Sequence, residues 1–322
     1  MTTVVACGPL VTIQDAGRPG HLARGLARGG AADRRALDEA AALLGDCGAG
    51  IEIPGAPLTL RLSAPAMVAL TGAPMRAEAG GRALDWHAAH PIPAEADVTL
   101  RPTGQGVYSY LHMRGGFDTE VVMGSRAAHL IAGIGQPLAS GDRLAHAPSD
   151  GDARVIAVAD RFDGGVLRVL PTPQTALFPE AEIARFEATT FRRDTRGNRQ
   201  GVRLTLDGDG FATEGQLDLL SDFILPGDVQ MTGDGVPYIL GPECQTTGGY
   251  PRIGTVIEAD LPRAMQAPPG AALRFRFVTL DEARAARPRL PEVAPLVRHA
   301  GTAELLRANL IGGVISAKGE TE

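Results

Sequence analysis

The chain has 322 residues, a formal net charge of -6 and a pI near 5.7, so it lacks the basic field expected of a nucleic-acid-binding protein. Hydrophobic residues make up 44% of the chain, and the 41 glycines and 24 prolines indicate frequent tight turns. No run reaches the roughly 18 apolar residues needed to cross a bilayer. The single lysine, Lys318, excludes a phosphate-binding P-loop. We expect a turn-rich globular protein with neither nucleic-acid nor membrane partners.

The cysteines and histidines indicate neither a disulfide framework nor a metal site. Cys7, Cys47 and Cys244 are widely spaced and form no Cys-x-x-Cys pair, which favours reduced thiols and a cytoplasmic location. Cys244 has no histidine nearby in sequence and is read as an inert thiol. His87 and His90 lie three apart, but a proline follows directly and no acidic ligand has metalloprotease spacing.

The first candidate binding element is the 14–20 loop, Gln-Asp-Ala-Gly-Arg-Pro-Gly. Its glycines and proline predict a rigid turn that presents Arg18 to a substrate carboxylate through a planar, two-pronged contact. The alternative is that Asp15 and Arg18 pair with each other and only fix the turn. Gln14, Asp15 and Arg18 are the substrate-binding candidates here, and the sequence leaves both interpretations open.

Regular elements follow on both sides of a predicted domain boundary. Asp33 predicts the start of a helix that Gly45 would end. Alternating apolar residues predict strands over residues 58–62 and 273–277. These patterns predict a mainly β fold of the β-rich α+β class.

Two domains are expected from the length, an N-terminal β-rich domain over residues 1–162 and a C-terminal one over 163–322. The turn-rich stretch over residues 149–165 marks the boundary between them. Two further helices are expected, over residues 179–187 and 302–310.

The 198–204 loop, Asn-Arg-Gln-Gly-Val-Arg-Leu, leads into another predicted strand. Arg199 is its residue most available to bind an anion, and Asn198 lies beside it. The alternative is a solvated turn, which loop position alone favours modestly.

The 245–251 motif, Gln-Thr-Thr-Gly-Gly-Tyr-Pro, combines an amide, two hydroxyls and two glycines. Glycine lets the backbone approach a ligand and offers unobstructed N–H donors, so an oxyanion or phosphate cradle is one interpretation. The other is a glycine-rich hairpin with Tyr250 packed as a lid. The candidate catalytic residues are Gln245, Thr246, Thr247, Gly248 and Gly249, with Tyr250 and Arg252 as substrate-binding candidates.

The 245–251 motif and the 14–20 loop together resemble the biotin-dependent carboxyltransferase/allophanate hydrolase subunit 2 family. Supporting segments lie at residues 29–33, 70–73, 114–117 and 254–257. The 198–204 loop departs from the family pattern Asp-Arg-Met-Gly-Tyr-Arg-Leu, and Asn198 leaves vacant any role of that aspartate as a base.

The resemblance implies cyclophilin-like β-barrel domains and a complex that opens 5-oxoproline to glutamate. ATP is the co-substrate of the complex, and the subunit that binds it is left open. The resemblance also implies two partner chains, a related inhibitor-like (B-type) subunit and a lactam-utilisation (A-type) subunit, and predicts little activity for the chain alone. No biotin is expected on this chain, because Lys318 lacks the Met-Lys-Met surroundings of biotinylated domains. The alternatives are a carboxyltransferase or allophanate-processing subunit of urea degradation, or a regulatory partner that binds an inhibitor of a histidine kinase.

Overall fold

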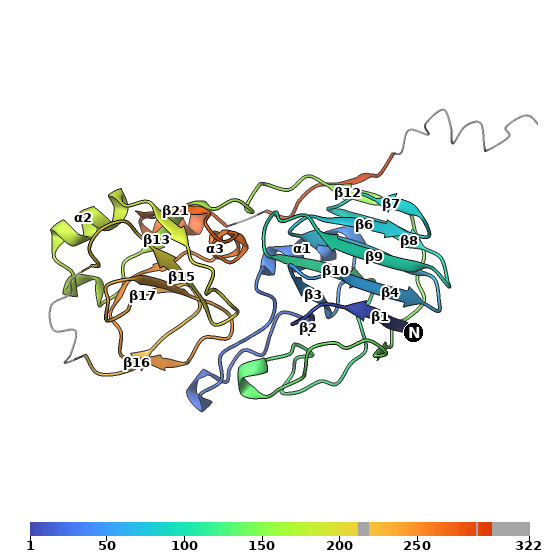
Figure 1. Cartoon of the computed structure of the whole chain (residues 1–322), viewed down its shortest axis with the longest axis horizontal. Helices are drawn as coiled ribbons and strands as arrows, with labels where there is room; N and C mark the ends of the chain where they lie inside the picture. The colour runs from blue at the N-terminus through green and yellow to red at the C-terminus, as the bar shows by residue number, and fades with distance from the viewer. Residues whose placement is uncertain (212–218, 288, 298–322) are drawn as a thin grey trace, which may run out of the picture.

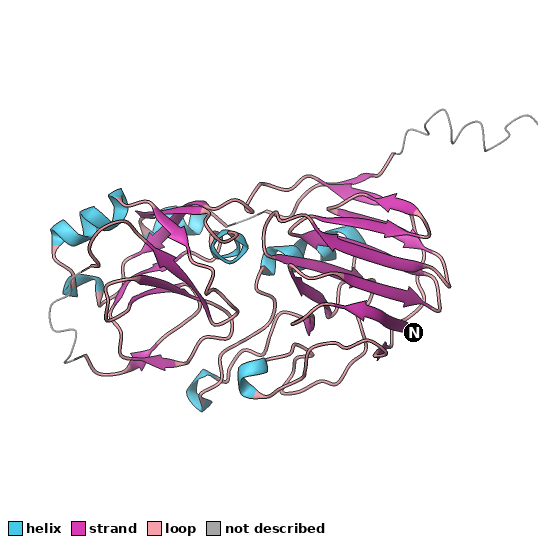
Figure 2. Ribbon diagram, viewed as in Figure 1, coloured by secondary structure: helices cyan, strands magenta, loops and turns pink. Residues whose placement is uncertain are grey.

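The computed structural model describes residues 1–211, 219–287 and 289–297. These residues form two β-rich lobes, one built on two large sheets and the other on a closed barrel (Figures 1 and 2). Helices are few and short, which confirms the predicted mainly β fold. Within the described ranges, no helix is long and apolar enough to cross a membrane.

The N-terminal lobe consists of two sheets. The six-stranded sheet has the order β11 (Arg143–Leu144), β1 (Thr2–Cys7), β4 (Leu58–Leu62), β9 (Asp97–Pro102), β6 (Met75–Ala79) and β7 (Arg82–Leu84). The seven-stranded sheet has the order β2 (Thr12–Gln14), β3 (Gly50–Pro54), β10 (Tyr108–Met113), β5 (Ala66–Gly72), β8 (Ala88–Ile92), β12 (Arg154–Ile156) and β22 (Val293–Pro295).

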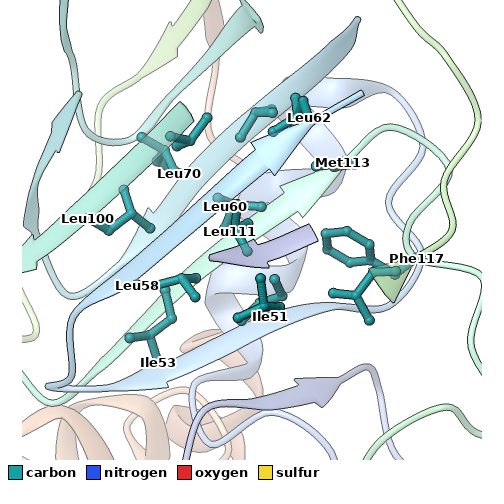
Figure 3. Close-up of a cluster of buried hydrophobic side chains, with 14 of the residues drawn as sticks. Ile51, Ile53, Leu58, Leu60, Leu62, Leu70, Leu100, Leu111, Met113 and Phe117 are labelled. Carbon is teal, nitrogen blue, oxygen red and sulfur yellow. The ribbon is translucent and has the colours of Figure 1, made fainter. Parts of the chain in front are cut away.

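The core of this lobe lies between the two sheets, where side chains from both interdigitate (Figure 3). Leu58, Leu60 and Leu62 of β4 are buried, whereas Thr59 and Arg61 between them are not, as the alternating pattern predicts. Each buried leucine contributes roughly 1.5–3 kcal/mol relative to an exposed one. The two-residue period therefore determines which face of β4 packs inward.

Helix α1 (Arg34–Leu44) begins and ends where the sequence predicts. The Asp33 carboxylate accepts a hydrogen bond from the Ala36 backbone N–H at 3.3 Å, and Gly45 ends the helix in the left-handed region at φ +81°. Leu43 and Leu44 pack on the seven-stranded sheet. Two short 3-10 helices, η1 (Leu22–Arg24) and η2 (Leu130–Ala132), lie in the long loops of this lobe.

The C-terminal lobe is the closed barrel. Its strands follow the order β13 (Gly165–Leu170), β20 (Arg252–Val256), β17 (Asp228–Met231), β18 (Pro237–Leu240), β15 (Gly201–Thr205), β14 (Phe191–Arg193) and β21 (Ala272–Phe277). The parallel pair β13 and β21 closes the ring. A small ribbon pairs β16 (Asp222–Phe223) with β19 (Thr247–Gly248).

Helices η3 (Thr175–Leu177), α2 (Glu180–Ala188), α3 (Leu261–Gln266) and α4 (Leu280–Ala285) accompany the barrel. Phe186 of α2 stacks on Phe275 of β21 with ring centroids 4.4 Å apart, which anchors α2 to the barrel. Helix α2 confirms the prediction for residues 179–187, whereas the helix predicted over 302–310 lies outside the described residues.

Strand β22 returns to the first lobe, where Pro295 pairs with Arg154 of β12. It belongs to the N-terminal sheet although its residues fall in the predicted 163–322 span. The division after residue 162 itself stays a prediction.

The two lobes share a packed interface. Ala31, Ala32 and Tyr110 of the first lobe belong to the same apolar cluster as the barrel interior. Gln266 of α3 is fully buried there, and its amide oxygen accepts from the Tyr108 backbone N–H at 2.9 Å. Its amide nitrogen donates to the Asp33 carboxylate at 2.8 Å. Buried polar groups with their partners in place fix how the lobes dock.

Candidate functional site

The 14–20 loop is fixed to residues 122–128 of the same lobe. Gln14 is buried, and its amide nitrogen donates to the Ala128 carbonyl at 3.1 Å. The Asp15 carboxylate accepts hydrogen bonds from the Gly17 backbone, the Ser125 hydroxyl at 2.6 Å and the Arg126 backbone at 2.7 Å. Both Asp15 oxygens are occupied, so this carboxylate shapes the loop and is not free to meet a substrate.

Arg18 is almost completely buried, with 1% of its surface exposed. Its Nε donates to the Val122 carbonyl at 3.3 Å and its Nη2 donates to the Ala127 carbonyl, while Nη1 is buried with no hydrogen-bond partner among the described residues. No ion pair joins it to Asp15 in the described part of the chain. Burial lowers the pKa of Arg18, and the charges of Asp15 and Glu243 oppose that shift. The predicted Asp15–Arg18 pair is therefore not formed.

His129 lies beside Arg18, and sequence analysis missed it. It is 3% exposed, and its Nδ1 faces the Ala132 backbone N–H at 3.3 Å. Because Nδ1 accepts that hydrogen bond, the ring proton resides on Nε2, which is buried with no partner in the described ranges. Burial lowers the pKa of His129, Glu243 opposes the shift, and Arg18 adds to it. The ring is therefore held neutral, with one unpartnered N–H.

Arg199 is the centre of a second buried cluster. Its Nε donates to Glu243 at 2.6 Å, its Nη1 donates to Glu52 and its Nη2 donates to the Gly30 carbonyl at 2.6 Å. Burial opposes the charged form, yet Glu52 and Glu243 outweigh it and raise the pKa of Arg199. This corrects the expectation that Arg199 is available to bind an anion or lies in a solvated turn. Two carboxylates already neutralise it, and it ties the barrel to the first lobe.

Asn198 is exposed, and its side-chain oxygen accepts from the Gln200 backbone N–H at 2.8 Å. That contact shapes the turn before β15. Asn198 therefore acts on the local backbone, whereas its neighbour Arg199 reaches across to the other lobe.

The 245–251 motif begins at this cluster and extends away along the β16–β19 ribbon. Glu243 precedes it, and the Pro242 carbonyl accepts from the Gly29 backbone N–H at 3.0 Å. Gln245 and Thr247 are exposed, Thr246 is buried and Tyr250 is 49% exposed. The structure thus brings the start of the motif close to the 14–20 and 198–204 loops.

Gly248 has no room for a side chain. A Cβ there would lie 2.7 Å from the Gln230 amide nitrogen and 3.1 Å from Ile224. That amide nitrogen is buried with no hydrogen-bond partner in the described part of the chain, so it is a further donor beside the motif that the sequence did not indicate. At Gly249, by contrast, the nearest atoms to an added Cβ are 3.7 Å away. The unpartnered Gln230 amide nitrogen therefore lies directly beside Gly248 of the motif.

Arg252 is held by contacts within the barrel. It donates to the Phe223 carbonyl at 2.7 Å, to Gln174 at 3.2 Å and to Asp222, with Asp228 a further contact at 3.3 Å. These partners join β20 to the β16–β19 ribbon. Arg252 is therefore engaged in shaping the motif rather than free for a substrate.

Two cavities flank the segment that holds the 14–20 loop. One, of about 460 Å³, is lined in part by Arg18, Ala127 and Ala128, immediately before His129. The other, of about 450 Å³, is lined in part by Asp15 and Cys47. Burial raises the pKa of the Cys47 thiol to about 12, so this thiol is a poor nucleophile. Burial likewise raises the pKa of Cys244 to about 12, in line with its interpretation as inert.

Comparison with known proteins gives the family. The chain matches the family model described as carboxyltransferase domain, subdomain A and B, over residues 24–277. It is 35% identical over 294 residues to the C subunit of 5-oxoprolinase from Escherichia coli strain K12, covering 89% of this chain and 94% of that one. It is 30% identical to the protein of the same name in Haemophilus influenzae, covering 84% and 89%.

Among solved structures, the chain is similar to TTHA0988, with a TM-score of 0.75 and 28% identity. The match covers 85% of this chain and 55% of TTHA0988, so the chain spans about half of that protein. The family model, over residues 24–277, takes in parts of both lobes. The chain belongs to the carboxyltransferase domain, subdomain A and B, family.

Proposed function

We propose that this chain is the C-type subunit of an ATP-dependent 5-oxoprolinase complex, which opens the lactam of 5-oxoproline to L-glutamate. The observation that carries the proposal is the pair of matches to 5-oxoprolinase C subunits, each spanning nearly the whole of both chains. The interface between the lobes supports it, because it concentrates buried hydrogen-bond donors where two of the predicted loops meet.

The reaction defines what such a site must do. A lactam carbonyl resists water, so ATP activates its oxygen, and the site must stabilise negative charge on oxygen as the ring opens. The Gln230 amide nitrogen and the backbone N–H groups of Gly248 and Gly249 are neutral donors suited to that task, and the Gln230 amide lies directly beside Gly248. Gln245 and Thr246, at the start of the same 245–251 motif, would orient the activated oxygen. Arg18 is suited to hold the substrate carboxylate.

The proposal includes partners. The enzyme is completed by a related B-type subunit and an A-type lactam-utilisation subunit, and ATP binds elsewhere in that complex, because this chain lacks a P-loop lysine. No biotin is attached to this chain. A cytoplasmic location fits the three free cysteines, Cys7, Cys47 and Cys244.

The alternatives share the family but have weaker support. The urea-degradation role is favoured only by a more distant relative, a putative urea carboxylase of Emericella nidulans, which is 29% identical over 88% of this chain but only 25% of that protein. A role in urea degradation, or in binding an inhibitor of a histidine kinase, would use the same fold. Neither accounts for two relatives with the same name that match over nearly their full length.

Reconstitution tests the proposal. The chain is mixed with purified A-type and B-type subunits, and glutamate formed from 5-oxoproline is measured with and without ATP. We expect ATP-dependent glutamate from the three-subunit mixture and none from this chain alone. A mixture that assembles and yet leaves 5-oxoproline unchanged would refute the proposed activity, and robust turnover by the lone chain would refute the shared site.

A further inference from the structure

Two side chains beside Gly29, Arg18 and His129, each carry a buried N–H donor without a partner in the described ranges. Arg18 Nη1 and His129 Nε2 are both unsatisfied, and their side chains are 1% and 3% exposed. A Cβ placed on Gly29 would lie 3.0 Å from His129 Cδ2 and 3.6 Å from Arg18 Nη1. The ring and the guanidinium therefore approach one common point next to a residue that has no side chain.

Buried polar groups almost always have partners, so a pair of unsatisfied donors at one place indicates a bound acceptor. The other donors of Arg18 are already used on the Val122 and Ala127 carbonyls, which hold the guanidinium in one orientation. The contact between Ala132 N–H and Nδ1 does the same for the His129 ring. Both side chains are thus positioned before any ligand arrives.

The charges around this pair favour an anionic acceptor. Arg199 is neutralised by direct contact with Glu52 and Glu243, whereas Arg18 forms no ion pair in the described ranges. The carboxylate oxygens of Asp15 already accept hydrogen bonds from Gly17, Ser125 and Arg126. Arg18 therefore keeps a positive charge without a contacting carboxylate, in a site where hydrogen bonds to charged groups are strong.

Access is provided by the cavity of about 460 Å³, whose wall includes Arg18 and the two residues that precede His129. A five-membered cyclic amino acid is well below that volume. The cavity therefore leads a small molecule as far as the guanidinium of Arg18.

We propose that Arg18 Nη1 and His129 Nε2 together bind the carboxylate of a small cyclic amide acid, with His129 the donor that makes the site selective for a carboxylate. This inference rests on the proposed function for the identity of the substrate. The donor pair itself rests on the geometry alone. His129 is a substrate-binding residue in this account, and Gly29 is the residue at which a side chain would crowd both the His129 ring and the Arg18 guanidinium.

The test compares two substitutions of His129 in the full chain and in the reconstituted complex. His129→Asn keeps an acceptor for the Ala132 N–H but has no donor at the position of Nε2. His129→Gln keeps a donor that reaches that position. Binding is measured by calorimetry with 5-oxoproline, with acetate and with 2-pyrrolidinone, which has the lactam but no carboxylate. The His129 Nε2 resonance is followed by side-chain nitrogen NMR of the unsubstituted protein.

We expect 5-oxoproline to shift the Nε2 resonance, and His129→Asn to weaken 5-oxoproline binding about ten- to hundred-fold with little change in melting temperature. His129→Gln should recover part of the affinity. Binding of 2-pyrrolidinone should be weak and unaffected by either change. Equal affinities of the Asn variant and the unsubstituted protein would overturn the inference, as would a silent Nε2 resonance at saturating 5-oxoproline.

A second pair of variants tests whether a side chain at Gly29 blocks carboxylate binding to Arg18 and His129. Gly29→Ala would place a methyl group 3.0 Å from His129 Cδ2 and 3.6 Å from Arg18 Nη1, whereas Gly25→Ala has nothing within 4 Å of the new Cβ. Both glycines have positive φ, +63° and +79°, so both variants carry a similar backbone strain. Only Gly29→Ala should abolish carboxylate binding, and equal binding by the two variants would contradict the site.

These outcomes separate the two proposals. If the complex does not hydrolyse 5-oxoproline but acetate still binds in a manner that depends on His129 and Arg18, the proposed function fails and the carboxylate site stands. If the complex turns over normally with His129→Asn, the function stands and the carboxylate site fails.

Discussion

Arg18 is buried in the N-terminal lobe and Arg199 at the contact between the lobes, and they differ in what surrounds the charge. Arg199 contacts two carboxylates and a backbone carbonyl, so its charge is compensated within the chain. Arg18 contacts only neutral carbonyls of the described residues and keeps one nitrogen unpartnered beside His129. A compensated arginine holds a fold together, whereas an uncompensated one is prepared for an anion that arrives from outside.

The largest effect should come from removing the compensated arginine. Arg199→Ala leaves Glu52 and Glu243 buried without a cation, and we expect unfolding free energy to fall by about 3–5 kcal/mol. Urea denaturation measures it. Arg61→Ala is the matched control, because its ion pair with Asp97 is exposed to solvent and its loss should change the free energy of unfolding far less. Similar losses in the free energy of unfolding for Arg199→Ala and Arg61→Ala would contradict the structural role assigned to Arg199.

Acid should weaken the N-terminal lobe, where the described buried histidines reside. Burial lowers the pKa of His87 and of His112 to about 4 each, against an ordinary value of 6.5. The unfolded chain therefore binds protons that the folded chain rejects. The contribution of each neutral histidine to the free energy of unfolding is fully present above pH 6.5 and is lost as the pH falls toward 4. Between pH 7 and pH 5 the free energy of unfolding should fall by roughly 2 kcal/mol for each histidine.

Denaturation at both pH values tests this for the unsubstituted protein and for His112→Asn. The variant should show a shallower decline between pH 7 and pH 5, because one of the histidines with a lowered pKa is removed. A stability that is constant across this range would show that these histidines do not titrate in this way.

Replacing the uncompensated arginine should affect catalysis. Arg18→Lys keeps the charge but not the planar arrangement of donors, so catalytic efficiency of the reconstituted complex should fall about ten- to hundred-fold, equivalent to about 1.5–3 kcal/mol. The contacts to Val122 and Ala127 are also lost, so some loss of stability is expected. Kinetics are measured at a temperature where the variant is fully folded, and normal kinetics there would remove Arg18 from the site.

The smallest effect is expected at Asn198. Asn198→Asp restores the residue type expected at this family position and keeps the acceptor for the Gln200 N–H. Since Asn198 is exposed, we expect a change in stability of about 0.5 kcal/mol or less and catalytic efficiency within about three-fold. A much larger rise in activity would assign a base to this loop.

Local patterns predicted the elements well. Alternation predicted β4 and β21, and capping residues predicted both ends of α1, because these features depend on a few neighbouring residues. The return of β22 to the first lobe was not predictable, since pairing with β12 joins segments far apart in sequence.

The site was predicted only in part, for the same reason. The sequence offered Arg18 and Arg199 as candidate anion-binding residues, with structural alternatives left open, but it carried no sign that Glu52 and Glu243 would neutralise Arg199. His129 had no local signal, because its role depends on its approach to Arg18 and Gly29 in the fold. Of the two carboxylates, Glu243 is the one that the sequence could have indicated, because it lies two residues before the 245–251 motif.

The most direct test of the difference between the two arginines is a paired measurement on Arg18→Lys and Arg199→Lys in the reconstituted complex. Melting temperature and steady-state kinetics with 5-oxoproline are recorded on the same preparations. The account predicts that Arg199→Lys chiefly lowers the melting temperature, with near-normal turnover of the folded complex, and that Arg18→Lys chiefly lowers catalytic efficiency. The opposite assignment, with activity lost at Arg199 and only stability lost at Arg18, would contradict it.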